Sequence, residues 1–327
     1  MVFNMTNVYI VSTPYHLLIT IVKTLLSHRE GLDTVIIIHD NINKDVIKRS
    51  ESIFKEITTK YNRFNIFTNI IEEKICQKIP LLSNSFTERA KLKDLFSNSK
   101  IFIFDDNSFF SCWLNTSRIN YNLIEDGLNF FKMSPFLRTK RMKLYDCLYT
   151  ILGIYWQRWG KSEFTQSIEV NENKDLKIRH RNIVVANREI MFKSLSEESI
   201  DTIANIFGFS SLKTIQQGPK TLLLTQPLSE DGILSHARKI KLYKNLIEHY
   251  SIGTLYIKPH PRETENYAEI FPNAIILGNS KIPFEVYQLK EKLHFDTAIT
   301  AFSTAIDAIF CADNKVSKTK EWTLNFH

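Results

Sequence analysis

The sequence is poor in residues that interrupt regular structure. Its 327 residues include only nine glycines and nine prolines, so long flexible linkers and low-complexity tails are not expected. The four cysteines are far apart and none forms a Cys-x-x-Cys pair, which argues against structural zinc and favours buried free thiols in a reducing compartment. No apolar run reaches the roughly 20 residues needed to cross a bilayer, and the N-terminus lacks the pattern of a signal peptide. We therefore expect a cytoplasmic globular protein.

Several nucleotide-binding signatures are also missing. Neither the Walker A motif nor the glycine fingerprint of dinucleotide-binding domains occurs, which removes the main support for a kinase or a dehydrogenase. The net charge of +7 favours an anionic partner. Basic residues cluster at 138–143 without zinc-finger spacing or RNA-binding aromatics, so an anionic small substrate or a membrane surface is favoured over nucleic acid. A solvated basic face is the alternative for that cluster.

Short β-branched runs alternate with longer amphipathic stretches along the chain. Helices are predicted over residues 15–28 and 234–250, and another is expected to begin at Ser303. Strands are predicted over residues 8–11, 34–38, 101–104, 121–124, 183–185, 221–225, 254–257, 274–277 and 297–300. Continuous apolar strands between helices are typical of parallel sheets covered on both faces.

The two series of strands predict two Rossmann-like domains, at residues 1–215 and 216–327. Gly208 and Gly218 bracket the expected boundary. Ligands of such folds bind beyond the carboxyl ends of the strands, and the cleft between two facing domains is the natural site. Polar residues directly after strands are therefore the first candidates for chemistry.

The first candidate is Glu125-Asp126-Gly127, which follows the strand at 121–124. Glycine permits a sharp turn there, and a carboxylate at that edge could remove a proton from a sugar hydroxyl. An acidic turn without catalysis is the alternative. A second copy, Glu230-Asp231-Gly232, follows the strand at 221–225. For this copy we favour capping of the next helix by Ser229 or Asp231 over an active-site role.

The third candidate is Lys258-Pro259-His260-Pro261-Arg262-Glu263, directly after the strand at 254–257. Two prolines fix the backbone around one histidine. An imidazole held in this way can donate to a phosphate oxygen or protonate a departing phosphate. A structural histidine is the alternative, but the strand-end position and the nearby cations favour function.

Further candidates follow the last predicted strand and the segment before it. Ser303 and Thr304 would begin a helix, where hydroxyls and backbone N–H groups bind anions. An ordinary N-cap is equally compatible. Glu285 could accept hydrogen bonds from ribose hydroxyls or be an exposed helix glutamate. Asp105 and Asp106 suggest a metal site, but the cations and hydroxyls near His260 offer a metal-independent way to hold a phosphate.

The order of these motifs resembles that of bacterial sialyltransferases, more specifically glycosyltransferase family 52, which includes lipooligosaccharide and capsule enzymes. The similar segments are residues 9–18, Thr225-Gln226-Pro227-Leu228-Ser229, residues 258–263 and Ser303-Thr304, together with the acidic motif after residue 124. Each segment is short, but their order and spacing together are fairly specific. Related transferases often have two serines where this chain has Ser303 and Thr304, a change that keeps the hydroxyl.

The resemblance implies a GT-B fold and an inverting, metal-independent transfer from CMP-sialic acid to a galactose-ended glycan. Asp126 would be the general base, Glu125 would support it, and His260 would help CMP leave. The donor would be bound by the C-terminal domain. The other implied substrate-contacting residues are Thr13, Gly127, Gln226, Lys258, Pro261, Glu285, Ser303 and Thr304. No cofactor is implied, and family members act at the cytoplasmic face of the inner membrane, some as dimers.

Two other functions remain compatible with these residues. A CDP-glycerol-type transferase of envelope polysaccharides also uses a His-Pro motif on a GT-B-like fold. A non-catalytic glycan- or nucleotide-binding protein is the alternative of another class, since function resides in sites and not in folds. The sequence does not determine the acceptor, the α2,3 or α2,6 linkage, or the oligomeric state.

Overall fold

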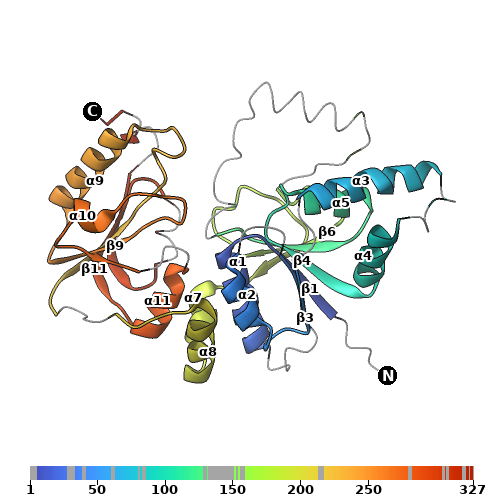
Figure 1. Cartoon of the computed structure of the whole chain (residues 1–327), viewed down its shortest axis with the longest axis horizontal. Coiled ribbons are helices and arrows are strands. Elements are labelled where there is room, and N and C mark those ends of the chain that lie inside the picture. Colours follow the sequence, from blue (N-terminus) through green and yellow to red (C-terminus); the bar gives the residue numbers. More distant parts are fainter. Residues whose placement is uncertain are drawn as a thin grey trace. The chain divides into compact units, whose positions relative to one another are not determined.

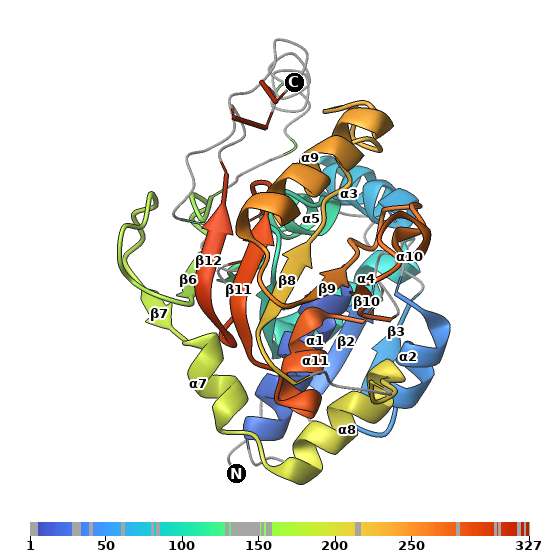
Figure 2. The same ribbon diagram turned by 90° about the vertical axis from the view of Figure 1, so that its left-hand side faces the viewer.

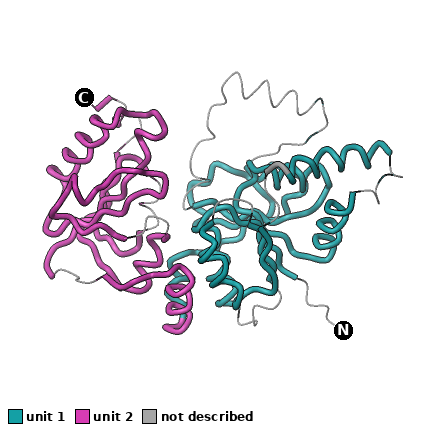
Figure 3. Tube along the Cα trace, in the orientation of Figure 1, with its two compact units in different colours: residues 1–195 teal, residues 196–327 magenta. Residues whose placement is uncertain are grey.

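The protein folds into two compact units, residues 1–195 (unit 1) and 196–327 (unit 2), as the computed structural model shows (Figure 3). The structure describes residues 6–27, 34–38, 42–59, 63–79, 82, 86–127, 131, 151, 154, 159–212, 217–278, 282–303, 306, 309–318, 322–323 and 325–326. Each unit has its own sheet, and every pair of neighbouring strands in both sheets runs parallel.

Unit 1 is built on a seven-stranded sheet with the order β3-β2-β1-β4-β5-β6-β7 (Figure 1). Its strands are β1 (Thr6–Val11), β2 (Thr34–Ile38), β3 (Glu56–Thr58), β4 (Ser99–Ile103), β5 (Tyr121–Ile124), β6 (Thr165–Val170) and β7 (Ile183–Val185). Its helices are α1 (Pro14–Leu26), α2 (Lys44–Ser50), α3 (Arg63–Lys78), α4 (Thr87–Ser97), α5 (Phe109–Thr116) and α7 (Arg188–Lys193). Strands β2 and β5 are buried along their whole length, as expected of strands covered on both faces.

Unit 2 is built on a five-stranded sheet with the order β10-β9-β8-β11-β12. Its strands are β8 (Lys220–Leu224), β9 (Thr254–Lys258), β10 (Ile275–Ile276), β11 (Phe295–Thr300) and β12 (Ala312–Ser317). Its helices are α8 (Glu197–Phe207), α9 (His236–Tyr250), α10 (Tyr267–Ile270) and α11 (Phe284–Glu291). Helix α9 packs against β11, and Figure 2 shows it near the upper ends of β8 and β11.

The strands predicted from continuous apolar runs are confirmed, and the missed strands are polar or short. Predicted residues 8–11, 34–38 and 121–124 correspond to β1, β2 and β5. Strand β12 has the sequence Ala-Asp-Asn-Lys-Val-Ser and no buried residue, and it lies at a sheet edge. Because such a strand is recognisable only by its pairing with β11, its own sequence does not predict it.

Helix α9 begins later than the sequence suggested. Its N-cap is Ser235, whose hydroxyl accepts a hydrogen bond from the Arg238 N–H at 3.4 Å. The prediction that Ser229 or Asp231 caps this helix is therefore wrong. Backbone bonds from Ile233 and Leu234 to the Leu228 carbonyl fold residues 228–234 into a compact turn before the helix starts.

The division of the chain falls before α8 and not at the boundary expected near residue 215. The apolar face of α8, which includes Ile203 and Phe207, is buried, and this helix packs against α11 of unit 2. Gly208 ends α8 in the left-handed conformation, at φ 64°. Residues 196–207 therefore belong structurally to the second unit.

The last residues of the chain contact unit 2. The Lys318 ammonium lies over the Tyr250 ring at 4.5 Å, and the Arg238 guanidinium donates to the Phe326 carbonyl. These contacts attach the described part of the tail to α9. Within the described residues, no helix is long and apolar enough to cross a membrane.

Candidate functional site

Glu125 and Asp126 follow β5 directly but have different surroundings. The Glu125 side chain is buried, and its carboxylate accepts hydrogen bonds from the Asn171 N–H at 2.8 Å and the Phe131 N–H at 3.3 Å. Its own N–H donates to the Glu169 carbonyl at 2.9 Å. Glu125 therefore fixes the backbone at the end of β5, whereas the Asp126 side chain is 41% exposed.

The Asp126 carboxylate is anchored by His16, a residue far from it in the sequence. His16 Nε2 lies 2.7 Å from Asp126 Oδ1, although the two residues are 110 positions apart. The His16 side chain is only 2% exposed, and its ring stacks on Phe104 with 4.4 Å between ring centroids. One carboxylate oxygen is thus held from inside the fold, while the group as a whole reaches solvent.

The protonation pattern of neutral His16 is set by a backbone group. The Ser12 N–H points at His16 Nδ1 at 3.3 Å, and the Ser12 hydroxyl lies 3.0 Å from the same nitrogen. Because a backbone N–H can only donate, Nδ1 is the acceptor and the ring proton lies on Nε2. Neutral His16 therefore donates its hydrogen bond to Asp126.

Local sequence places His16 at this position. Thr13 caps α1, with its hydroxyl accepting from the His16 N–H at 3.1 Å, and Pro14 follows at the start of the helix. Thr13 was predicted to contact substrate, and that role stays a prediction beside its observed capping role. His16 was not among the predicted site residues, and its sequence signals were the spacing Thr-Pro-x-His and its place in the family-like segment at residues 9–18. Gly127 has φ +80°, which meets the expectation of a glycine-dependent turn after Asp126.

A buried charge cluster lies near this carboxylate turn. Glu169 Oε1 accepts from Arg188 Nη1 at 2.8 Å, and Glu169 Oε2 accepts from Lys23 Nζ at 2.5 Å. Burial alone would raise the pKa of Glu169, but the two cations outweigh it and lower the pKa. The backbone N–H of Arg188 also donates to the side chain of Asn171 at 2.8 Å, and Asn171 is the residue whose own N–H donates to Glu125. None of these three charged residues was predicted, since they lie on separate elements.

Asp105 and Asp106 have backbone partners. Asp106 is buried and accepts from the Gly160 N–H at 2.7 Å, while Asp105 accepts from the Asn107 N–H at 2.6 Å. Asp105 therefore stabilises the turn between β4 and α5, and Asp106 holds this turn against the distant residue Gly160. These contacts favour a structural role over the alternative of a metal site.

In unit 2 the His260 loop follows β9. The His260 N–H donates to Glu263 Oε2 at 2.8 Å and lies 3.2 Å from the Thr225 hydroxyl. His260 Nδ1 accepts from the Arg262 N–H at 3.2 Å, so the neutral ring carries its proton on Nε2. Burial, followed by the nearby Arg262 charge, lowers the pKa of His260. Pro261 lies within this turn, as predicted.

Lys258 and Glu285 are brought together from β9 and the first turn of α11. Both residues are buried, and Lys258 Nζ lies 5.6 Å from the centre of the Tyr287 ring. Burial lowers the pKa of Lys258 to about 8, opposed by the Glu285 charge. Burial likewise raises the pKa of Glu285. The exposed-helix interpretation of Glu285 is therefore wrong.

Gln226 joins two strand ends. Its side-chain oxygen accepts from the Phe302 N–H at 2.9 Å, and its backbone N–H and C=O both bond to the Tyr243 hydroxyl, at 2.7 and 3.1 Å. Gln226 therefore positions the residue directly before Ser303. Thr304 lies outside the described residues.

The helix predicted from Ser303 is not supported by the residues described there. Ile306 and Ile309 donate to carbonyls three residues earlier, at 3.4 and 3.2 Å, in turns tighter than an α-helix. Ser303 itself is half-buried.

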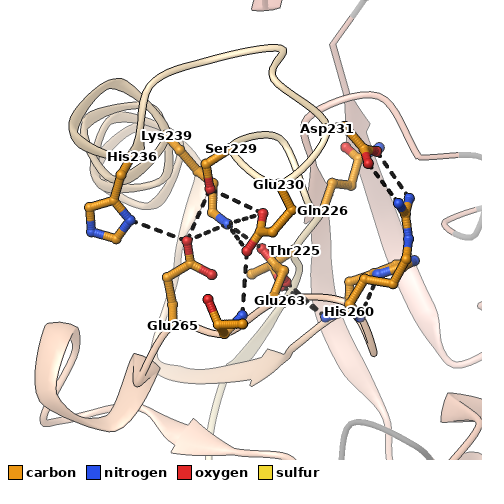
Figure 4. A network of polar contacts seen from close by, with 12 residues as sticks. Thr225, Gln226, Ser229, Glu230, Asp231, His236, Lys239, His260, Glu263 and Glu265 are labelled. Carbon is orange, nitrogen blue, oxygen red and sulfur yellow. Dashed lines mark hydrogen bonds and ion pairs between the residues drawn. The ribbon is translucent and has the colours of Figure 1, made fainter.

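Three glutamates surround one buried lysine beside the His260 loop (Figure 4). Lys239 Nζ lies 3.0 Å from Glu230, 3.0 Å from Glu263 and 2.6 Å from Glu265. These carboxylates are spaced so that they could hold a metal ion, but the ammonium group already supplies the cation. Asp231 instead forms a bidentate pair with Arg262, at 2.6 and 3.0 Å. The acidic copy at residues 230–232 thus supports the His260 loop.

The chain is similar to known proteins in both sequence and fold. The model of glycosyltransferase family 52 matches residues 33–320. A curated Haemophilus influenzae protein described as uncharacterized is 35% identical over 190 residues, which are 58% of this chain and 58% of that protein. The chain thus matches less than two thirds of that relative's length.

Solved structures of similar fold include bacterial sialyltransferases. The α/β-galactoside α-2,3-sialyltransferase of Photobacterium phosphoreum has a TM-score of 0.58 and 16% identity, covering 96% of this chain and 90% of that one. The 2,6-sialyltransferase of Photobacterium sp. JT-ISH-224, solved with CMP and lactose, has a TM-score of 0.55 and 13% identity, covering 95% and 71%. The GT-B domain of a Photobacterium damselae sialyltransferase has a TM-score of 0.52 and 14% identity, covering 93% and 88%. These likenesses confirm the predicted GT-B fold class.

Proposed function

Because the chain belongs to glycosyltransferase family 52, we propose that it transfers sialic acid from CMP-sialic acid to a galactose-ended glycan. The observation that carries this proposal is the Asp126 carboxylate, exposed at the end of β5 and held at 2.7 Å by buried His16. Two structures of similar fold are described as galactoside and lactose-bound sialyltransferases, and this supports the same substrate class.

Unit 1 supplies the base. Asp126 accepts the proton of an acceptor hydroxyl as the hydroxyl oxygen forms its bond to the anomeric carbon of sialic acid. The bond from that carbon to the CMP phosphate oxygen breaks, and its electron pair leaves with CMP, so the configuration inverts. His16 keeps one carboxylate oxygen in place through its Nε2–H, leaving the other for the proton. A positioned base of this kind contributes roughly 10²–10⁴-fold to the rate.

Unit 2 binds the donor. His260 donates its Nε2–H to the phosphate as negative charge grows there, and the Lys258 ammonium adds a positive charge beside it. Ser303 and Thr304 add hydroxyl donors, and Glu285 accepts from the ribose. The fixed backbone of His260 supports this assignment, since a preorganised donor needs no rearrangement during the reaction.

This chemistry needs no metal and no cofactor, because fixed cations and N–H groups neutralise the phosphate. The backbone contacts of Asp105 and Asp106 support this part of the proposal. We propose that the reaction takes place at the cytoplasmic face of the inner membrane, and we leave the linkage to experiment.

The test is a transfer assay with CMP-sialic acid and lactose, in which released CMP is measured with and without the acceptor. Acceptor-dependent release that disappears in Asp126→Asn supports the proposal. If CMP-sialic acid gives no release with any galactoside while CDP-glycerol raises the melting temperature, the chain is a CDP-glycerol-type transferase instead. Binding of CMP-sialic acid without turnover would indicate a binding protein.

A further inference from the structure

Two buried side chains on one face of α9 contact the two loops assigned to the donor. Lys239 and Tyr243 are four residues apart and therefore adjacent on the helix surface. Both are fully buried. Lys239 contacts Glu263 in the His260 loop. Tyr243 contacts Gln226, which is bonded to the residue before Ser303.

The first connection runs from Lys239 through Glu263 to the His260 backbone (Figure 4). Lys239 Nζ lies 3.0 Å from Glu263 Oε1, which also accepts from the Tyr267 hydroxyl at 2.7 Å. The other oxygen, Oε2, accepts the His260 N–H at 2.8 Å and contacts the Thr225 hydroxyl. Since the Glu263 side chain is 1% exposed, water cannot replace these partners.

The second connection runs from Tyr243 through Gln226 to Phe302. The Tyr243 hydroxyl accepts the Gln226 N–H at 2.7 Å and donates to the Gln226 carbonyl at 3.1 Å. Gln226 Oε1 then accepts the Phe302 N–H at 2.9 Å. One turn of α9 is therefore bonded to the ends of β8, β9 and β11.

We propose that Lys239 and Tyr243 are positioning residues for donor binding, which set the place of His260 and Ser303 without touching the substrate. This inference rests on the proposed function of that loop pair. It assigns a role to α9, a helix that contributes no predicted catalytic residue.

The charges show why Lys239 has the larger effect. Three carboxylates share one ammonium, and two of them, Glu263 and Glu265, are almost fully buried. Burial alone would lower the pKa of Lys239, but hydrogen bonds to Glu265, Glu263 and Glu230 outweigh it and raise the pKa. Removing the ammonium would leave buried carboxylates without a counter-charge. Glu263 must then take up a proton or move, and either change alters the acceptor of the His260 N–H.

The experiment compares Lys239→Met with Lys241→Met and Lys244→Met, two exposed lysines of the same helix. In the sialyl-transfer assay we expect Lys239→Met to lower kcat about 30-fold and to raise the donor KM, with the acceptor KM within twofold of the wild type. Both control variants should keep wild-type constants. Unchanged kcat and donor KM in folded Lys239→Met would overturn the inference. Absence of transfer by the wild type would instead refute the proposed function.

A second pair of variants separates positioning from stability. Glu265→Gln disturbs the same cluster but leaves the contacts of Glu263, so it should lower kcat less than threefold at any melting temperature. Tyr243→Phe keeps the ring and removes both bonds to Gln226, so it should raise the donor KM several-fold. If Glu265→Gln and Lys239→Met lost activity in proportion to their melting temperatures, the role would be stability alone.

A readout independent of catalysis follows the His260 ring itself. In a ¹H–¹³C spectrum, the Hε1–Cε1 signal, assigned with His260→Gln, should shift in Lys239→Met and stay in place in Lys241→Met. Such a shift would support the positioning role of Lys239 even if another donor were the true substrate. An unmoved signal in folded Lys239→Met would overturn the inference.

Discussion

The two proposed catalytic groups are held in contrasting ways. Asp126 is an exposed side chain fixed at one oxygen by one histidine ring. His260 is fixed through its backbone by Glu263, within a cluster of buried Lys239 and three glutamates, two of them almost fully buried. A base that meets different acceptors needs access, whereas a donor to one constant phosphate needs a fixed place. The contrast suggests that acceptor choice can vary in unit 1 while the loops of unit 2 stay constant.

The largest expected effect separates chemistry from donor binding. Asp126→Ala should lower kcat about 10³-fold, within the range for a lost general base, and leave CMP affinity within twofold. Asp126→Asn keeps an oxygen that accepts the His16 Nε2–H but cannot take up a proton, so its kcat should fall by the same factor. Steady-state kinetics and CMP titration measure both. Recovery of activity in Asp126→Asn would contradict the base assignment.

A smaller loss, accompanied by weaker binding, is expected in unit 2. His260→Gln should lower kcat/KM about 100-fold and weaken CMP binding, because the ring is assigned to the phosphate. The matched control is His249→Gln, an exposed histidine on α9. If His260→Gln and the wild type bound CMP with equal affinity, His260 would not belong to the donor site. The comparison of Asp126 with His260 as two catalytic groups would then fail.

Removing the His16 hydrogen bond that anchors Asp126 should lower kcat less than removing the Asp126 carboxylate itself. His16→Phe preserves the ring stack on Phe104 but removes the 2.7 Å bond to Asp126, and should lower kcat about tenfold. Ser12→Ala keeps the backbone N–H that sets the His16 tautomer, so it should cost less than twofold. Similar activities of His16→Phe and wild type would show that Asp126 needs no anchor.

Donor binding should also depend on pH through Lys258. Its pKa of about 8 means that Lys258 is charged at pH 7 and mostly neutral at pH 9. CMP affinity should therefore fall several-fold between these values, as the attraction for the phosphate is lost. Isothermal titration at both pH values tests this, and Lys258→Met should flatten the dependence. A fall of the same size in Lys258→Met would assign it to another group.

The smallest expected effect is that of metal removal. Because the phosphate is assigned to cations and N–H groups of unit 2, dialysis against EDTA should leave kcat within about 20% of its starting value, on the electrostatic argument above. A large loss restored by Mg²⁺ would return Asp105 and Asp106 to consideration as metal ligands.

The sequence predicted the parts of the fold that depend on local pattern, and it supplied the candidate site residues that follow strand ends. Buried strands such as β2 and β5 were recognisable from apolar runs. The strand-end rule singled out Asp126 and His260 before any geometry was known. The family match confirms the predicted membership of glycosyltransferase family 52.

The partners of those residues could not be predicted, because they depend on contacts between distant segments. His16 meets Asp126 across 110 positions, and Lys239 meets Glu263 from a different element. The wrong helix cap had a related cause, since Asp231 pairs with Arg262 and the Ser229 hydroxyl bonds to Glu265, which leaves capping to Ser235. Contacts between charged residues of distant segments thus determined the side-chain partners and the helix cap, which the local sequence did not specify.

The cluster of Lys239 with Glu230, Glu263 and Glu265 limits how unit 2 can change in evolution or by design. Its single positive and three negative charges come from three separate stretches of sequence, so no one stretch can be exchanged alone without unbalancing the others. A loop taken from a relative would have to be exchanged together with the face of α9 that it contacts. The helix and its loops therefore have to change together if donor recognition is to be kept.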